Sequence, residues 1–171
     1  YKKFLNDCQS AELRKISEVY YTKYIELSKS EFDPNVEFIQ TNNQSPVNLL
    51  SKFENKVLYL DFWASWCSPC LKSVSQAMEL KKHYENTDFE IIFIGHRDQR
   101  SSIEAAIKRF DIIGKHLILN QNETETWRKE FKVGGIPAYV LLDKKHNVVE
   151  FNAPHPDSPL IYNMIDSLLI E

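Results

Sequence analysis

The sequence predicts an α/β fold, in which helices cover both faces of a central mixed sheet and a helical extension precedes the sheet. Two apolar runs of strand length, Val57–Trp63 and Phe89–Ile94, are typical of strands buried on both faces. Segments of helical period alternate with the strand candidates along the chain. Ala138–Leu142 and Val148–Phe151 lie either side of a short polar turn, which predicts a closing hairpin.

The first 32 residues form the predicted extension. From Gln9 to about Lys29, apolar residues recur at intervals of three and four, the period of one amphipathic helix. Pro34 ends this segment, because proline cannot continue a helix and favours an extended residue before it. We therefore divide the chain into an extension, residues 1–32, and a main domain, residues 33–171. Because the chain begins with Tyr1, we interpret the extension as the end of an upstream region.

The main domain contains further elements that follow from apolar period and from turn residues. They are predicted strands at Val36–Thr41, Val47–Asn48 and Leu117–Leu119, and predicted helices at Leu49–Phe53, Pro69–Tyr84, Ser102–Phe110, Glu123–Phe131 and Pro159–Ile170.

Size and charge limit the classes of partner. A chain of 171 residues can bury one sizeable core, and its formal net charge of −3 does not attract nucleic acid or an anionic membrane. No apolar run approaches the roughly 20 residues that a membrane helix requires. We expect a soluble monomer that neither binds nucleic acid nor inserts into a membrane.

The spacing of the cysteines carries the functional signal. Cys67 and Cys70 form a C-x-x-C sequence directly after a buried strand and in the first turn of the next helix. Free N–H groups and the helix dipole favour a thiolate on Cys67, and Pro69 is tolerated because first-turn N–H groups lack helical partners. Cys70 lies one turn further on, within reach of a mixed disulfide on Cys67. We therefore expect an exposed attacking thiol and a resolving thiol.

Two other interpretations of the pair remain open. A zinc site would need two further ligands at suitable spacing, and Cys8 is the only other cysteine. A purely structural disulfide would close so short a loop that it would remove little entropy from the unfolded chain. We expect no metal site. We interpret Cys8 as a small residue on the N-terminal helix, with a disulfide to another molecule as the alternative.

Two ordered motifs resemble known signatures. The segment from Tyr59 to Cys70 resembles the active-site strand and helix of thioredoxins, and Gly135–Tyr139 resembles the loop whose cis-proline lies against the disulfide in that family. The resemblance extends from about Asp33 to the C-terminus. The leading strands and the longer segment between the two motifs resemble the TlpA/ResA-type thiol-disulfide oxidoreductases of the bacterial envelope.

The resemblance implies a thioredoxin-like fold and assigns roles to matching positions. Cys67 attacks, Cys70 resolves, and Pro137 with Ile136 shapes the client groove. From their place beside Cys67, we also assign Trp66, Ser68 and Pro69 to the client-binding surface. Without the resemblance, an ordinary tight turn would explain Gly134-Gly135, and an X-Pro bond is cis in only about 5% of cases. Trp66 could equally be a packing residue.

Asp61 interrupts an otherwise apolar strand. Strand alternation places it on the face of Val57 and Tyr59, where burial would raise the pKa of its carboxyl group. There it could exchange a proton with Cys70, as the buried acid of thioredoxins does at the matching position. Many TlpA-like proteins instead carry an acid just after the start of the C-x-x-C helix, and Leu71-Lys72-Ser73 offers none. The alternative is a solvated acid near the end of the strand.

Three other polar or aromatic residues near these motifs have simpler interpretations. We assign Trp63 to the core. His96 and Arg97 follow the Phe89–Ile94 strand at the sheet edge where α/β proteins often bind ligands, but we expect them to be solvated loop residues.

The sequence therefore predicts an enzyme that exchanges electrons with protein thiols and disulfides through Cys67 and Cys70, as a reductase rather than an oxidase. It would need an external electron donor or acceptor protein and no dissociable cofactor. Two alternatives belong to other classes, namely a redox-silent binding module and a metallochaperone. The envelope or periplasm of a bacterium is the location that the resemblance implies.

Overall fold

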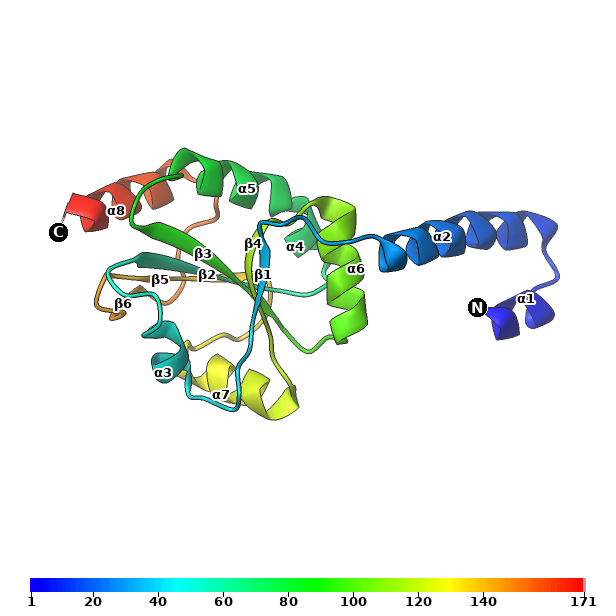
Figure 1. Cartoon of the computed structure of the whole chain (residues 1–171), viewed down its shortest axis with the longest axis horizontal. Coiled ribbons are helices and arrows are strands. Elements are labelled where there is room, and N and C mark those ends of the chain that lie inside the picture. The colour runs from blue at the N-terminus through cyan, green and yellow to red at the C-terminus, as the bar shows by residue number, and fades with distance from the viewer. Residues whose placement is uncertain (171) are drawn as a thin grey trace.

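The computed structural model describes residues 1–170, and it confirms a thioredoxin-like α/β fold with a mixed sheet. The sheet has the strand order β1-β4-β3-β2-β5-β6 (Figure 1). Its strands are β1 (Val36–Ile39), β2 (Val57–Trp63), β3 (Phe89–Gly95), β4 (Gly114–Ile118), β5 (Ala138–Leu142) and β6 (Val148–Glu150). The strands β1, β4, β3 and β2 run parallel to one another, whereas β5 runs antiparallel to β2 and β6 runs antiparallel to β5.

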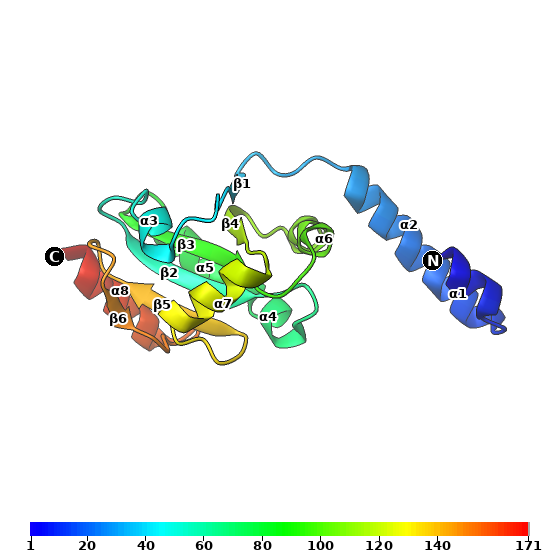
Figure 2. The ribbon, with the colours of Figure 1, turned by 90° about the horizontal axis from the view of Figure 1, so that it is seen from below.

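Helices cover both faces of the sheet (Figures 1 and 2). One face carries α5 (Val74–His83), α6 (Arg100–Phe110) and α8 (Pro159–Ile170), and the other carries α3 (Pro46–Leu50) and α7 (Gln121–Glu130). Each face has its own buried apolar cluster. The whole of β2 is buried between them, as its apolar sequence predicts.

Side-chain alternation along β2 decides what lies beside the site. Val57, Tyr59 and Trp63 pack into the cluster beneath α5 and α8, and the intervening residues pack towards α3 and α7. Asp61 lies two residues from Tyr59 and from Trp63, so its side chain points to the same face as theirs. The strand therefore delivers its carboxyl group to the face that also holds both cysteines of the C-x-x-C sequence.

The N-terminal segment forms two helices rather than the single one predicted, α1 (Lys2–Asp7) and α2 (Ala11–Lys29). They project from the main domain, and α1 folds back beside α2 (Figure 2). Tyr1 stacks on Tyr21 with 3.8 Å between ring centroids, which joins the two helices. Neither helix contains a buried residue. α2 contacts α6 of the main domain, but most of its apolar stripe is exposed.

Two sequence predictions within the main domain are wrong. Val47–Asn48 is not a strand but part of α3, because the Ser45 hydroxyl caps the Asn48 N–H group (3.3 Å) and Pro46 starts the helix. The long helix predicted at Pro69–Tyr84 is broken at Ser73 into α4 (Ser68–Lys72) and α5. The other predicted elements are present: β2, β5 and α8 have the predicted ends, and the ends of the rest are shifted.

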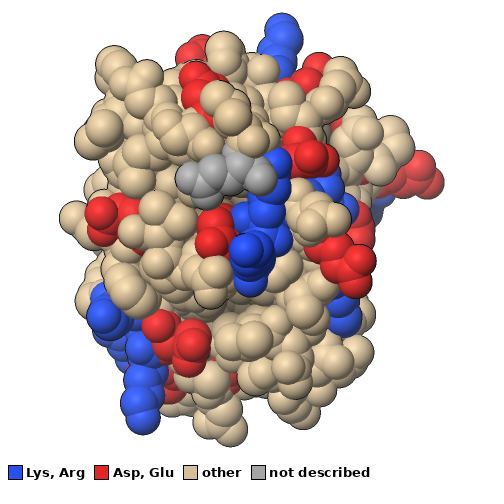
Figure 3. Space-filling model, turned by 90° about the vertical axis from the view of Figure 1, so that its left-hand side faces the viewer, with Lys and Arg blue, Asp and Glu red and all other residues tan. Residues whose placement is uncertain are grey.

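Within residues 1–170, no helix combines the length and the apolar character needed to cross a bilayer. Figure 3 shows the face that carries the end of α8, where basic and acidic side chains lie next to one another. Neither sign of charge dominates that face.

Candidate active site

The two cysteines lie where β2 passes into α4. Cys67 is the N-cap of α4, and its Sγ accepts the main-chain N–H of Cys70 at 3.2 Å. The two sulfur atoms are bonded at 2.03 Å, with 5.3 Å between the Cα atoms. The predicted strand-to-helix placement thus sets both sulfurs at the helix N-terminus, where a negative charge on sulfur is stabilised.

The expectation that Cys67 is exposed is wrong for this disulfide form. Both cysteines are only 4% exposed and belong to the buried cluster beneath α5 and α8. The disulfide joins Cys67 to Cys70, which is buried at the same depth. Trp66, Ser68 and Pro69 around it are exposed, so the sulfur lies directly beneath the surface.

The second motif lies beside the first. The Ile136–Pro137 peptide bond is cis, and Ile136 packs against the cluster that contains both cysteines. Antiparallel pairing of β5 with β2 brings this loop to the site, with Ala138 opposite Phe62. Arg128 holds the preceding turn by donating to the carbonyl oxygens of Val133 (3.0 Å) and Gly134 (3.1 Å).

Asp61 is 7% exposed, and burial raises the pKa of its carboxyl group to about 7. It pairs in register with Tyr139 of β5. Burial and the nearby Asp61 carboxyl group also raise the pKa of the Tyr139 hydroxyl. A carboxyl group with a pKa near neutrality can hold or release a proton at physiological pH.

Sequence analysis missed a hydrogen-bonded pair behind the cysteines. The Ser73 hydroxyl donates to the carbonyl oxygen of Cys70 (2.9 Å) and lies 3.1 Å from the hydroxyl of Tyr139. Tyr139 follows cis-Pro137 by two residues. Its place on the inward face of a strand was the available signal, whereas nothing in the sequence marked Ser73.

Trp66 is 60% exposed, and its Nε1–H donates to the carbonyl oxygen of Arg97 at 3.2 Å. Next to it, the Asp98 carboxylate accepts the main-chain N–H of Ser65 at 2.6 Å. The loop after β3 is therefore tied to the loop that carries the nucleophile. Trp63 lies in the core, where we assigned it.

The prediction of a solvated His96 is wrong, since this residue is only 5% exposed. The main-chain N–H of His96 donates to the carbonyl oxygen of Trp63 (2.8 Å). The pairing of β3 with β2 therefore continues one residue beyond β3, and the imidazole ring is buried. Burial, followed by the nearby Arg128 and Arg97 guanidinium groups, lowers the pKa of His96. Arg97 is exposed, as expected.

Cys8 lies at the C-cap of α1 rather than on the long helix where we placed it. The part of the chain that the structure describes contains no group of three or more His, Cys, Asp and Glu side chains arranged to hold a metal ion.

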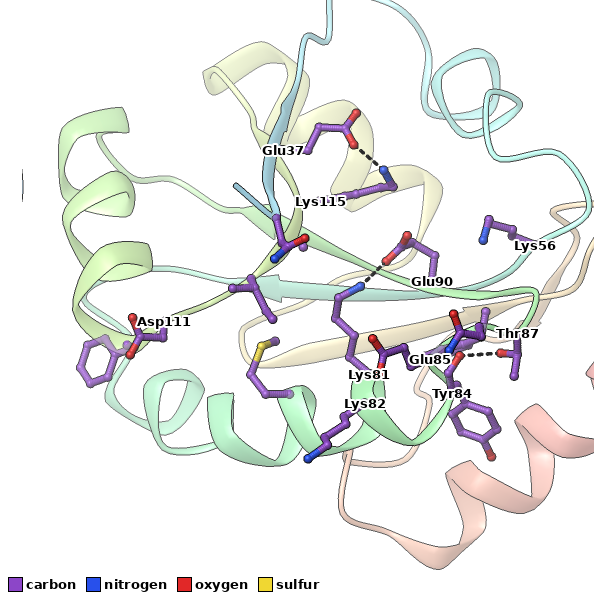
Figure 4. Close-up of a pocket in the computed structure, with 17 residues that line it drawn as sticks. Glu37, Lys56, Lys81, Lys82, Tyr84, Glu85, Thr87, Glu90, Asp111 and Lys115 are labelled. Carbon is purple, nitrogen blue, oxygen red and sulfur yellow. Dashed lines mark hydrogen bonds and ion pairs between the residues drawn. The ribbon is translucent and has the colours of Figure 1, made fainter. Parts of the chain in front are cut away.

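A separate cavity of about 820 Å³ lies at the opposite end of the sheet, beside the end of α5 (Figure 4). It is lined by residues at or before the starts of β2, β3 and β4, including Lys56, Phe89 and Gly114. The Lys81–Glu90 ion pair (2.7 Å) lies within it. The parallel strands begin at this end of the sheet, whereas the cysteine pair follows the carboxyl end of β2. The cavity is therefore remote from the cysteine pair.

A disulfide at the N-terminus of the helix after the central strand, next to a cis-proline loop on the neighbouring strand, defines a protein of the thioredoxin class. A family model described as thioredoxin-like matches residues 55–148. The chain belongs to this family.

Similar proteins agree with this assignment. Thiol-disulfide oxidoreductase ResA of Geobacillus kaustophilus is 27% identical over 112 residues, which cover 66% of this chain and 63% of the relative. The ResA protein of Bacillus thuringiensis subsp. konkukian is 27% identical over 131 residues, 77% of this chain and 73% of the relative. A solved thiol-disulfide oxidoreductase from Bacteroides fragilis matches with a TM-score of 0.59 and 25% identity, over 68% of this chain and 84% of that one. The match to the first relative thus spans less than two thirds of its length.

Proposed function

We propose that this protein is a thiol-disulfide oxidoreductase that reduces disulfides in client proteins. The observation that supports this function best is the Cys67–Cys70 disulfide at the N-terminus of α4. In that position a reduced Cys67 gains from the helix dipole as a thiolate, which is the form that attacks disulfides. The reducing direction is the one that the resemblance to TlpA/ResA-type proteins implies.

The reaction proceeds in two exchanges. The Cys67 thiolate attacks one sulfur of the client disulfide, which forms a mixed disulfide and releases the other client sulfur as a thiolate. Cys70 then loses its proton and attacks the Cys67 sulfur. This forms the Cys67–Cys70 disulfide and releases the second client sulfur, so two electrons have passed to the client. A dithiol donor protein returns the pair to the reduced form, and no dissociable cofactor takes part.

Asp61 accepts the proton of Cys70 during the second exchange. Its buried position on the face of the cysteines and its pKa of about 7 support this role. Asp61→Asn is expected to slow release of the client from the mixed disulfide by about a hundredfold, the lower range for general base catalysis. Formation of the mixed disulfide should change much less, because Cys67 attacks as a thiolate.

The client docks on the rim around the sulfurs. This rim consists of Trp66, Ser68 and Pro69 on one side and Ile136 and Pro137 on the other, and all five side chains are exposed or half-buried. An extended client segment can lie along this rim with its cysteine above Cys67. We also propose that the protein acts as a monomer in the envelope or periplasm of a bacterium, where client disulfides form.

Trapping tests the proposed function. In a Cys8→Ser background, Cys70→Ser should accumulate mixed disulfides with a reducible protein such as denatured, oxidised ribonuclease, and Cys67→Ser should accumulate far fewer. Non-reducing electrophoresis and mass spectrometry locate the joined cysteine. If neither variant traps a client and the wild type reduces none, the chain is a binding module instead. Stoichiometric metal in the purified reduced protein would favour the metallochaperone alternative.

A further inference from the structure

A groove of about 240 Å³ lies between the N-terminal helix α2 and the helices α4 and α6 of the main domain, and we call it the extension groove. Its lining includes Ser65, two residues before Cys67. It also includes Leu71, which directly follows Cys70. Leu71 and Phe110, another lining residue, pack against the buried cluster that contains both cysteines. The extension groove is therefore continuous with the surface around the cysteine pair.

Small side chains on α6 leave this groove open. Ser102, Ala105 and Ala106 line it at the spacing of residues that share one face of a helix. Because these side chains are short, they do not fill the space beside α2. Two tyrosines of α2 border the opening, Tyr20 with 63% and Tyr24 with 43% of its surface exposed. The groove is smaller than the roughly 300 Å³ at which small-molecule sites begin, so its size suits an apolar side chain of a protein.

The charge of the extension groove is positive. Lys23 and Arg109 line it, and none of the described residues in its lining is acidic. Both side chains are exposed, and neither forms an ion pair with any residue from 1 to 170. The Arg109 guanidinium lies 5.2 Å from the centre of the Phe110 ring. The groove therefore combines apolar walls with two cations that no carboxylate of the described chain neutralises.

Residue types that anchor protein interfaces surround the groove. Tyr and Arg are enriched among the side chains that contribute most to the affinity of such interfaces. Exposed apolar patches bordered by polar residues mark interaction sites. The extension exposes more large apolar side chains than the main domain does, namely Tyr1, Phe4, Leu13, Ile16, Val19, Tyr20, Tyr21 and Tyr24. Because the groove is continuous with the redox site, the partner that it fits is the protein whose sulfur reacts with Cys67.

We propose that the extension groove binds a client segment in which a large apolar side chain and an acidic side chain are neighbours, while the client cysteine reacts with Cys67. The apolar side chain enters between α2 and α6, and the carboxylate pairs with Lys23 and Arg109. A second copy of this chain is a poorer partner, because a symmetric contact would set two positive grooves against each other. The proposal rests on the proposed function and deepens it, since it gives the N-terminal extension a part in the choice of client.

Single-turnover kinetics with the reduced protein in a Cys8→Ser background test the proposal. Two peptides carry a 2-thiopyridyl group on a central cysteine, which is flanked on both sides by Leu-Glu in the first peptide and by Leu-Lys in the second. The third substrate, 2,2′-dithiodipyridine, is an uncharged disulfide without a peptide. In each reaction the Cys67 thiolate forms a disulfide with one sulfur and the other sulfur leaves as 2-thiopyridone, whose absorbance gives the rate.

The expected result is a preference that follows the sign of the charge. The wild type should react faster with the Leu-Glu peptide than with the Leu-Lys peptide. Lys23→Glu and Arg109→Glu should each slow the Leu-Glu peptide by roughly 1.5- to fivefold and speed the Leu-Lys peptide by a similar factor, the range of an exposed ion pair. Tyr24→Ser should slow both peptides by about fivefold or more. None of these variants should change the rate with 2,2′-dithiodipyridine.

Lys15→Glu is the matched control. Lys15 is exposed on the same helix and does not line the groove, and its replacement changes the net charge by the same amount. If Lys23→Glu and Arg109→Glu resemble Lys15→Glu, the groove does not bind clients. Since the three lysine and arginine side chains are exposed, their variants decide the question even if Tyr24→Ser unfolds.

The remaining outcomes separate the groove from the redox chemistry. A wild type that reacts with 2,2′-dithiodipyridine but does not distinguish the two peptides overturns the groove proposal and leaves the proposed function standing. A wild type in which Cys67 reacts with none of the three substrates contradicts the proposed function itself. A dimer in analytical ultracentrifugation that Tyr24→Ser dissociates would show that a second copy occupies the groove, and the proposal would be wrong.

Discussion

The hydroxyl groups of Ser73 and Tyr139 lie 3.1 Å apart, and this contact joins the active-site helix to the strand that follows cis-Pro137. The Ser73 hydroxyl also donates to the carbonyl oxygen of Cys70, at the point where α4 ends. The pair thus fixes the position of the resolving cysteine relative to the proline loop. Both residues are buried, and within residues 1–170 the Tyr139 hydroxyl has Ser73 as its only hydrogen-bond partner.

Ser73→Ala and Tyr139→Phe should therefore be coupled. Each is expected to lower the free energy of unfolding of the oxidised protein by about 1 kcal/mol, because Ser73→Ala leaves the buried Tyr139 hydroxyl without a partner and Tyr139→Phe removes the same hydrogen bond from Ser73. The double variant should lose less than the sum of the two single losses. Urea denaturation measures all four proteins, and Tyr20→Phe on the exposed helix α2 is the control. Additive losses would show that the contact contributes nothing.

Asp61 makes the protein less stable as the pH rises. Burial raises the pKa of its carboxyl group to about 7, whereas a carboxyl group in the unfolded chain titrates near pH 4. Between about pH 4 and pH 7 the native state keeps a proton that the unfolded state has released, so the contribution of Asp61 to stability falls across this window. Asp61→Asn should remove that fall and be more stable than the wild type at pH 8. Urea denaturation from pH 4 to pH 8 checks this prediction. If the free energy of unfolding depends on pH in the same way in both proteins, the prediction is contradicted.

His116 has the opposite effect on stability: it makes the protein less stable as the pH falls. Burial lowers the pKa of its ring to about 4, and its Nε2 lies 2.8 Å from the carbonyl oxygen of Ile112. Between about pH 4 and pH 6.5 the unfolded state binds a proton that the native state excludes, so the contribution of His116 falls as the pH is lowered. His116→Gln can keep a donor towards Ile112 but binds no proton.

His116→Gln should therefore lose the part of the acid sensitivity that is due to His116, so the decline in stability due to Asp61 becomes more visible as the pH rises. Asp61→Asn should reveal the reverse slope, because the two groups oppose each other in the wild type. Denaturation midpoints measured for both variants at pH 4.5 and pH 6.5 compare the signs directly. If the denaturation midpoint changes with pH in the same direction in both variants, the opposite effects assigned to Asp61 and His116 are contradicted.

The sequence was sufficient to predict the centre of the fold and the position of the cysteines. The ends of β2 are those predicted, because a seven-residue apolar run rich in aromatic residues is typical of an interior strand. Alternation along that strand predicted the face of Asp61. The position of Cys67 followed from the helix that begins directly after it. The cis-proline came from the resemblance, since local sequence rarely specifies a cis bond.

Other features depend on contacts that local patterns do not contain. The helix break at Ser73 accompanies a bond to Tyr139, 66 residues further along the chain. The burial of His96 depends on pairing with Trp63 in a neighbouring strand. The apolar stripe of α2 predicted an amphipathic helix correctly, but a stripe cannot show whether the sheet domain covers it.

Shortening the chain tests how far the extension supports the main domain. α2 contains no buried residue, and its residues Leu13, Ile16, Val19 and Tyr20 are each at least 46% exposed. A chain that begins at Ser30 keeps the bond from Lys108 to the Ser30 carbonyl oxygen and the contact of Lys108 with the Phe32 ring. It should therefore unfold with a free energy within about 1 kcal/mol of the full chain.

Removing α8 is the matched control, because Ile161, Ile165 and Leu168 of that helix are buried against the sheet. Each buried aliphatic side chain contributes about 1.5–3 kcal/mol, so the chain without α8 is expected to lose most of its stability. Urea denaturation and circular dichroism compare the two shortened chains with the full one. If loss of α1 and α2 destabilises the protein as much as loss of α8, the extension is part of the main domain and the division at residue 32 is wrong.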